Sequence, residues 1–148
     1  MFNKLIENST AKSPWLYHMN TGSCNGCDIE IVAALTPHFD AERFGCKLAG
    51  TPRHADIILI TGPVTEQSKD RLIRTLEQVP EPYVVMAVGS CPNSCNVFKD
   101  SYSVAGPLEK YCHVDVSVSG CACKPEAIML GVVKATEILK EKRRAMKK

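Results

Sequence analysis

The chain has 148 residues and a mass of 16.2 kDa, and a single domain of that length buries about 70% of its unfolded surface, so its core needs no metal or disulfide to hold together. Hydrophobic residues make up 45% and charged residues 23% of the sequence, which excludes a largely disordered or fibrous chain. The formal net charge of +2 combines a basic segment at residues 140–148 with an acidic remainder. Because no aromatic residues are interleaved with these basic residues, we expect no nucleic acid as a partner.

The first third of the chain predicts a strand, a turn and a helix. Residues 15–19 are typical of a short strand, residues 21–26 contain the glycines of a turn, and residues 28–35 predict a helix that Pro37 ends. Residues 43–48 predict an additional edge strand. The segment before these elements, residues 1–13, is expected to be an N-terminal extension.

The middle of the chain predicts one right-handed βαβ unit. Residues 56–61 and residues 83–88 are short apolar runs rich in β-branched residues, which favours strands buried on both faces of a parallel sheet. Between them, residues 66–78 place leucine and isoleucine at helical spacing, and Thr65 stands where an N-cap is expected.

The last third predicts a strand over residues 114–118 and a long helix from residue 124 into the basic tail. Pro125 suits the first position of that helix, and one of its faces carries Ile128, Val132, Ala135 and Leu139. Strands that alternate with helices predict an open α/β sheet with helices on both faces, in which ligands bind beyond the carboxyl ends of the strands. We expect residues 14–139 to form this domain and residues 140–148 to form a basic C-terminal tail.

The eight cysteines are expected to be thiols rather than disulfides. No stretch reaches the roughly 18 consecutive apolar residues of a membrane span, and residues 1–13 lack the apolar region of a secretory signal. We therefore expect the chain to stay in the cytoplasm, where the thiol pool is reducing. Metal binding or redox chemistry is the leading function for so many thiols.

Four cysteines follow the ends of predicted strands. Cys24 and Cys27 come after the first strand, Cys91 follows the strand at residues 83–88, and Cys121 follows the last strand. Three strand ends thus bring thiols to one edge of the sheet. A four-cysteine set suits tetrahedral zinc or an iron-sulfur cluster, and Cys24 with Cys27 alone would suit a redox-active dithiol. Single ligands from distant loops favour the cluster over a zinc site with paired knuckles.

The other cysteines divide into two pairs. Cys46 and Cys112 lie in or beside apolar segments and are interpreted as buried thiols that pack like small hydrophobic residues. Cys95 and Cys123 lie near the expected ligands, where a further ligand or redox role stays open.

Four segments resemble the small-subunit family of NiFe hydrogenases and its relative in respiratory complex I. They are SPWLYHMNTGSCNGCDIEI, TPRHADIILITGPVT, EPYVVMAVGSCPNS and VDVSVSGCACKPEAIMLGV, and the resemblance spans residues 13–135. The CxxC pair with Asn-Gly between its cysteines is similar to membrane-bound energy-converting hydrogenases, whereas the complex I branch has two adjacent cysteines. Two departures from the family pattern are Cys95, where paired glycines are usual, and Cys123, where proline is usual.

The resemblance implies a flavodoxin-like fold that holds one proximal 4Fe-4S cluster at the carboxyl ends of the strands. By motif, its ligands would be Cys24, Cys27, Cys91 and Cys121. No further cluster is implied, because the chain lacks the export signal and the extra C-terminal domain of uptake hydrogenase small subunits. The motifs also indicate three residues for cluster tuning or an interface, and Arg53 is expected to face the cysteine edge. These residues are Glu30, Arg53 and His54.

The function implied by the resemblance is an electron-transfer subunit without catalytic residues of its own. Its expected partners are the NiFe large subunit, a ferredoxin-type iron-sulfur subunit and integral membrane subunits, with the whole complex at the cytoplasmic face of the membrane. One alternative is the equivalent relay in a complex I-like quinone or sulfur reductase. An alternative of another class is a structural zinc protein with a four-cysteine site.

Overall fold

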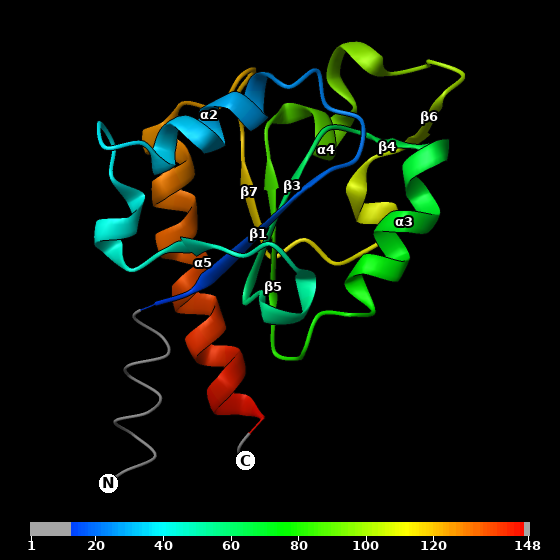
Figure 1. Cartoon of the computed structure of the whole chain (residues 1–148). Helices are drawn as coiled ribbons and strands as arrows, with labels where there is room; N and C mark the ends of the chain where they lie inside the picture. Colours follow the sequence, from blue (N-terminus) through cyan, green and yellow to red (C-terminus); the bar gives the residue numbers. More distant parts are fainter. Residues whose placement is uncertain (1–12, 147–148) are drawn as a thin grey trace, which may run out of the picture.

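A parallel sheet of five strands forms the centre of the computed structural model, which describes residues 13–146 (Figure 1). Its spatial order is β2-β1-β3-β5-β7. The strands are β1 (Trp15–Asn20), β2 (Lys47–Leu48), β3 (Ile57–Thr61), β5 (Val84–Val88) and β7 (Val116–Val118). Counted along the chain within this sheet, the order is 2-1-3-4-5, which is the flavodoxin-like arrangement. The predicted open parallel α/β sheet is confirmed.

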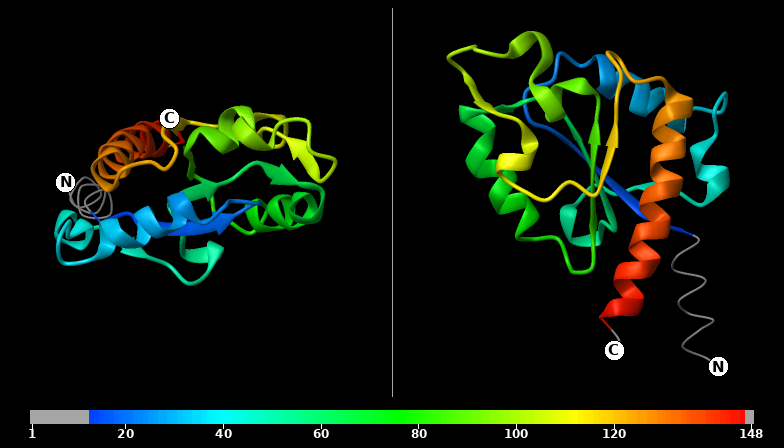
Figure 2. Two further views of the ribbon diagram at one scale, coloured as in Figure 1. Left: turned by 90° about the horizontal axis from the view of Figure 1, so that it is seen from above. Right: turned by 180° about the vertical axis from the view of Figure 1, so that it is seen from behind.

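Helices cover both faces of the sheet (Figures 1 and 2). α2 (Gly26–Leu35) and α5 (Pro125–Ala145) pack side by side on one face, and α3 (Glu66–Leu76) covers the other. The short helix α4 (Ser90–Ser94) follows β5 directly. A separate two-stranded antiparallel sheet joins β4 (Val64–Thr65) and β6 (Val104–Gly106). The connecting 3-10 turns are η1 (Ala41–Phe44), η2 (Pro52–His54), η3 (Asn96–Phe98) and η4 (Leu108–Lys110).

The two central strands are buried throughout, as their apolar runs predicted. Successive side chains of a strand point to opposite faces, so each strand supplies two core layers. Ile57 and Leu59 of β3 pack in the layer under α2 and α5, whereas Ile58 and Ile60 pack in the layer under α3. This double burial fixes the sheet rigidly between its helices and therefore fixes the loops that leave its carboxyl ends.

Two predicted elements differ in extent from those observed. The helix expected at residues 28–35 begins at Gly26, so Cys27 lies in its first turn. Of the edge strand expected at residues 43–48, only Lys47–Leu48 is extended, because the preceding residues form the 3-10 turn η1 and Gly45 closes that turn at φ 85°. Met1 to Lys12 of the expected N-terminal extension lie outside the described residues.

The basic segment at the carboxyl end is largely part of α5, which continues through Ala145. Lys142 Nζ lies 2.7 Å from Asp115 Oδ1 and donates to the Tyr83 carbonyl at 3.0 Å. Arg143 pairs with Asp56, just before β3. These two cations therefore bind the amino ends of the central strands within this chain. Lys147 and Lys148 lie outside the described residues. None of the helices between positions 13 and 146 has the length and apolar character needed to cross a bilayer.

Candidate metal centre

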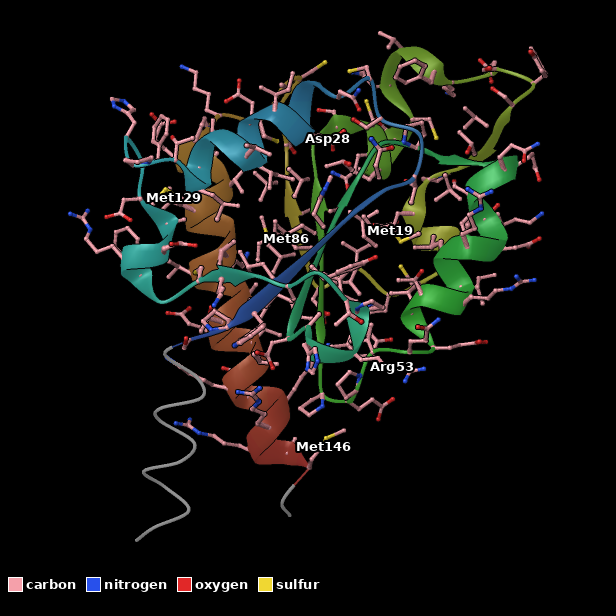
Figure 3. The ribbon with its side chains drawn as sticks, viewed as in Figure 1. Met19, Asp28, Arg53, Met86, Met129 and Met146 are labelled. Atoms are coloured by element: carbon pink, nitrogen blue, oxygen red, sulfur yellow. The ribbon has the colours of Figure 1, made fainter. Side chains whose placement is uncertain are left out.

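The four predicted ligands lie on loops and helix starts at one edge of the sheet. Cys24 lies between β1 and α2, Cys27 lies in the first turn of α2, Cys91 lies in α4 after β5, and Cys121 follows β7. Because β1, β5 and β7 belong to one parallel sheet, their carboxyl ends share that edge. Figure 3 shows this edge at the top, where Asp28, the neighbour of Cys27, is labelled.

Two glycines show how closely these loops approach one another. A Cβ built on Gly26 would lie 3.6 Å from Cys24 Sγ and 3.4 Å from the Ala122 methyl group, so the start of α2 meets the loop after β7. A Cβ built on Gly89 would lie only 2.8 Å from Cys27 Sγ, so the end of β5 meets the first turn of α2. The absence of a side chain at Gly89 therefore leaves room for a cysteine sulfur where three loops meet.

The electrostatics of Cys91 also place the four thiols together. Burial raises the pKa of Cys91, and the neighbouring thiols of Cys121, Cys24 and Cys27 raise it further. Cys24 and Cys121 are exposed, while Cys27 and Cys91 are partly buried. Each thiolate in such a group disfavours the next, so binding of a cation that neutralises them is favourable.

Cys123 lies beside this group but in a different environment. It is 1% exposed, and its thiol donates to the Val118 carbonyl at 3.2 Å. Burial raises its pKa to about 12, with the adjacent Cys27 adding to the effect. Its burial and its hydrogen bond to the Val118 carbonyl distinguish Cys123 from the exposed Cys121, and a ligand role for Cys123 stays an open prediction.

The remaining cysteines are buried or partly buried. Cys46 packs in the core layer under α2 and α5, as predicted. Cys112 is partly buried against the opposite layer, and burial raises its pKa to about 11. Cys95 is buried at the end of α4, where burial raises its pKa.

The donor set, four cysteines, fits an iron-sulfur cluster, which thiolates hold. Within residues 13–146, no three His, Cys, Asp or Glu side chains are close enough together to hold one metal ion. A tetrahedral zinc ion needs each sulfur at about 2.3 Å. In a four-iron cluster each thiolate binds a different iron, so the sulfurs stand farther apart. Four thiols from three loops, with a glycine clearing the space beside one of them, match the donor type of such a cluster.

A hydrogen-bond network beside Cys27 was not predicted. The Asp28 carboxylate is hydrogen-bonded to His18 Nε2 at 2.9 Å, to the Thr61 hydroxyl and to Asn20 Nδ2 at 2.6 Å. His18 and Asn20 alternate along β1, so their side chains leave the same face of the strand. That alternation, followed by an acidic residue directly after the CxxC pair, is the signal in the sequence that could have indicated the network.

Arg53 and His54 do not lie at the cysteine edge, so the expected placement beside the cluster was wrong, and an interface role for either residue stays a prediction. Both belong to η2, which precedes β3, so they lie at the amino ends of the parallel strands. The His54 ring is 6.1 Å from the ring of Trp15, the first residue of β1. Figure 3 shows Arg53 at the opposite edge from Asp28. Glu30, in contrast, lies on α2 three residues beyond Cys27, and its role stays a prediction.

Comparison with known proteins identifies a family whose sequence pattern this chain matches. Residues 24–135 match the family described as "NADH ubiquinone oxidoreductase, 20 Kd subunit". The chain is 58% identical over 128 residues to "Probable membrane-bound hydrogenase subunit mbhJ" of Pyrococcus furiosus, an alignment that covers 86% of this chain and 77% of the relative. It is 43% identical over 131 residues to formate hydrogenlyase subunit 7 of Escherichia coli, covering 88% of this chain and 51% of that protein.

One similar solved structure is a chain of the membrane-bound sulfane sulfur reductase, an archaeal respiratory membrane complex. The two chains superimpose with a TM-score of 0.80 at 38% sequence identity, over 93% of this chain and 76% of the other. The residues that match the family begin at Cys24 and include all four predicted ligands.

Proposed function

Because the chain belongs to the NADH ubiquinone oxidoreductase 20 kDa subunit family, we propose that it is the electron-transfer subunit of a membrane-bound hydrogenase complex. In this role it holds one 4Fe-4S cluster on Cys24, Cys27, Cys91 and Cys121. These four residues would hold the cluster, which would supply electron transfer between the NiFe large subunit and a ferredoxin-type iron-sulfur subunit. The family assignment agrees with the predicted resemblance to hydrogenase small subunits and complex I.

The observation that carries the proposal is the convergence of four cysteines from three loops at the carboxyl edge of a flavodoxin-like sheet. Ligands of open α/β sheets bind at that edge. The chain is 58% identical to a membrane-bound hydrogenase subunit and 38% identical to the sulfane sulfur reductase chain. This difference favours a role in a hydrogenase over a role in a sulfur reductase. A relay in a complex I-like reductase remains the second candidate, supported by the likeness to the sulfane sulfur reductase chain.

When bound, the cluster supplies reversible one-electron transfer, with a potential set by hydrogen bonds, charge and solvent access. The chain's own residues hold the four sulfurs at fixed strand ends. Gly89 leaves space beside Cys27 Sγ, and Cys123 is buried with its thiol bonded to the Val118 carbonyl. No proton-transfer or bond-making residue is required of this chain.

Apolar side chains near the cysteine edge support a partner that covers it. Ile29 and Val32 of α2 are exposed beside the ligand loop, and so are Val97 and Tyr102 in the segment after α4. Large exposed apolar patches mark protein interfaces, whereas single exposed apolar residues are ordinary; these four count toward an interface because they stand on the helix that carries Cys27 and on the segment that follows Cys91. We assign this surface to the large subunit, and we place the assembled complex, with its integral membrane subunits, at the cytoplasmic face of the membrane.

Replacing each of the four cysteines with serine in the full chain tests the ligand set. Iron per chain is expected to fall in each variant, because serine is a poor substitute for thiolate in such clusters. Cys112→Ala removes a thiol far from the edge and is the matched control, which should keep its iron. Full iron retention in the Cys91→Ser or Cys121→Ser variant would contradict the assignment. Iron loss in Cys123→Ala with retention in Cys121→Ser would move the ligand to the neighbouring thiol.

A further inference from the structure

The side chain of Asn20, the last residue of β1, organises the loop that carries Cys24 and Cys27. Its Oδ1 accepts hydrogen bonds from the backbone N–H groups of Gly22 and Ser23, both at 2.9 Å. Its Nδ2 donates to Asn25 Oδ1 at 3.2 Å and to Asp28 Oδ2 at 2.6 Å. A primary amide offers two donor hydrogens and one oxygen with two acceptor sites, so the loop and the first turn of α2 together use every hydrogen-bonding site of the Asn20 side chain.

Asp28 completes the connection on the helix side. One carboxylate oxygen accepts from Asn20, and the other is shared by His18 of β1 and Thr61 of β3. The side chain of Asp28 is 15% exposed, so these bonds are partly shielded from water. The first turn of α2, which carries Cys27, is thereby attached to two adjacent strands of the rigid sheet.

Ordinary helix capping does not account for this arrangement. Asn25 occupies the N-cap position of α2 in a left-handed conformation, with φ 66°, and makes no capping hydrogen bond with its side chain. Helices usually begin with a side-chain cap at that position. Here the loop is held from β1 instead, by an amide that contacts both its beginning, at Gly22 and Ser23, and its end, at Asp28.

We propose that Asn20 and Asp28 form a positioning pair that sets the spacing of the Cys24 and Cys27 sulfurs, an inference that rests on the proposed role of these cysteines as ligands. The pair closes the five-residue span between β1 and α2 with hydrogen bonds at both ends. Groups that orient metal ligands without binding the metal typically contribute 10- to 100-fold to metal affinity. Neither side chain is assigned as a ligand.

The decisive variant is Asn20→Ala, which removes all four hydrogen bonds without changing the charge. In the full chain loaded with iron, we expect iron release to a chelator to become at least about 10-fold faster. We also expect an altered EPR line shape in the dithionite-reduced protein. A charge effect alone would leave both properties unchanged in this variant.

The double variant Asn20→Asp/Asp28→Asn tests whether the two residues act as a pair. Asn20→Asp alone places two carboxylates in contact, and its iron release should be fast. In the double variant the amide at position 28 donates to the carboxylate at position 20, so the connection is restored at constant net charge. We expect iron release and the EPR line shape to return toward those of the original chain.

Asp56→Asn is the matched control, because Asp56 is hydrogen-bonded to Trp15 N and paired with Arg143 at the opposite edge of the sheet. It should lower the unfolding temperature while leaving iron release and the EPR spectrum unchanged. If the original chain holds no cluster, the proposed function fails. If it holds one and Asn20→Ala releases iron at the original rate with the same spectrum, only the positioning role fails. Fast release in the double variant equal to that of Asn20→Asp would refute the pairing.

Discussion

Gly89→Ala should both strain the backbone and displace a cysteine of the candidate site. Gly89 has φ 102° and ψ 168°, a region that only glycine adopts readily, and placing another residue there costs about 2 kcal/mol. Its new Cβ would lie 2.8 Å from Cys27 Sγ, whereas ordinary contacts begin at 3.4 Å. For a chain of this length, a loss of about 2 kcal/mol lowers the unfolding temperature by roughly 4–8 °C. The sulfur of Cys27 must also move away from its place beside β5.

Gly50→Ala is the matched control, because a Cβ at Gly50 has no atom within 4 Å and the backbone there is not left-handed. Thermal unfolding and iron content are measured for both variants of the full chain. Gly89→Ala is expected to unfold earlier and to hold less iron, and Gly50→Ala should match the original chain in both measurements. A Gly89→Ala variant with the original unfolding temperature and full iron content would refute the argument that Gly89 and Cys27 Sγ lie too close together for a side chain at position 89.

Three further predictions concern groups outside the ligand set. Lys142→Met removes the cation beside Asp115, whose side chain is only 6% exposed, and should lower the free energy of unfolding in urea by about 1–3 kcal/mol, since Lys142 itself is partly solvated; an unchanged midpoint would contradict this. Burial raises the pKa of Cys112 from 9.0 to about 11, so the folded state binds the thiol proton more tightly than the unfolded state does. The stability that this contributes is fully present below pH 9 and is lost as the pH rises through 11. Cys112→Ala should therefore lose less stability over that window, and an equal loss would disprove the cause. Arg53→Met should leave the midpoint potential of the proposed cluster unchanged, because Arg53 lies at the edge opposite the cysteines; a clear shift in that potential would contradict this placement of Arg53.

The central strands could be predicted from their apolar runs. The cysteine edge could be predicted from one rule of topology, which is that parallel strands all end at the same edge of a sheet. The apolar runs over β3 and β5 require burial on both faces. Parallel pairing then brings every residue that follows a strand to the same edge. The same rule explains why the expectation for Arg53 failed. Arg53 precedes its strand while the cysteines follow theirs, so the sheet separates them.

The network around Asp28 could not be predicted in this way, because it depends on strand register. β1 and β3 pair so that Asn20 stands beside Thr61, and only this register brings the Thr61 hydroxyl to the carboxylate of Asp28. The start of α2 at Gly26 was also missed, since its N-cap is a left-handed asparagine without the usual side-chain bond. Turn conformation and register are set by tertiary packing and leave little trace in the residue pattern.

Iron and zinc content, measured in the same anaerobically purified sample of the full chain, tests the central claim most directly. The account predicts about four irons per chain, no stoichiometric zinc, and a visible absorption band that dithionite bleaches. One zinc per chain, with no iron and no reducible absorption, would contradict the electron-transfer role and would make the four cysteines a structural site.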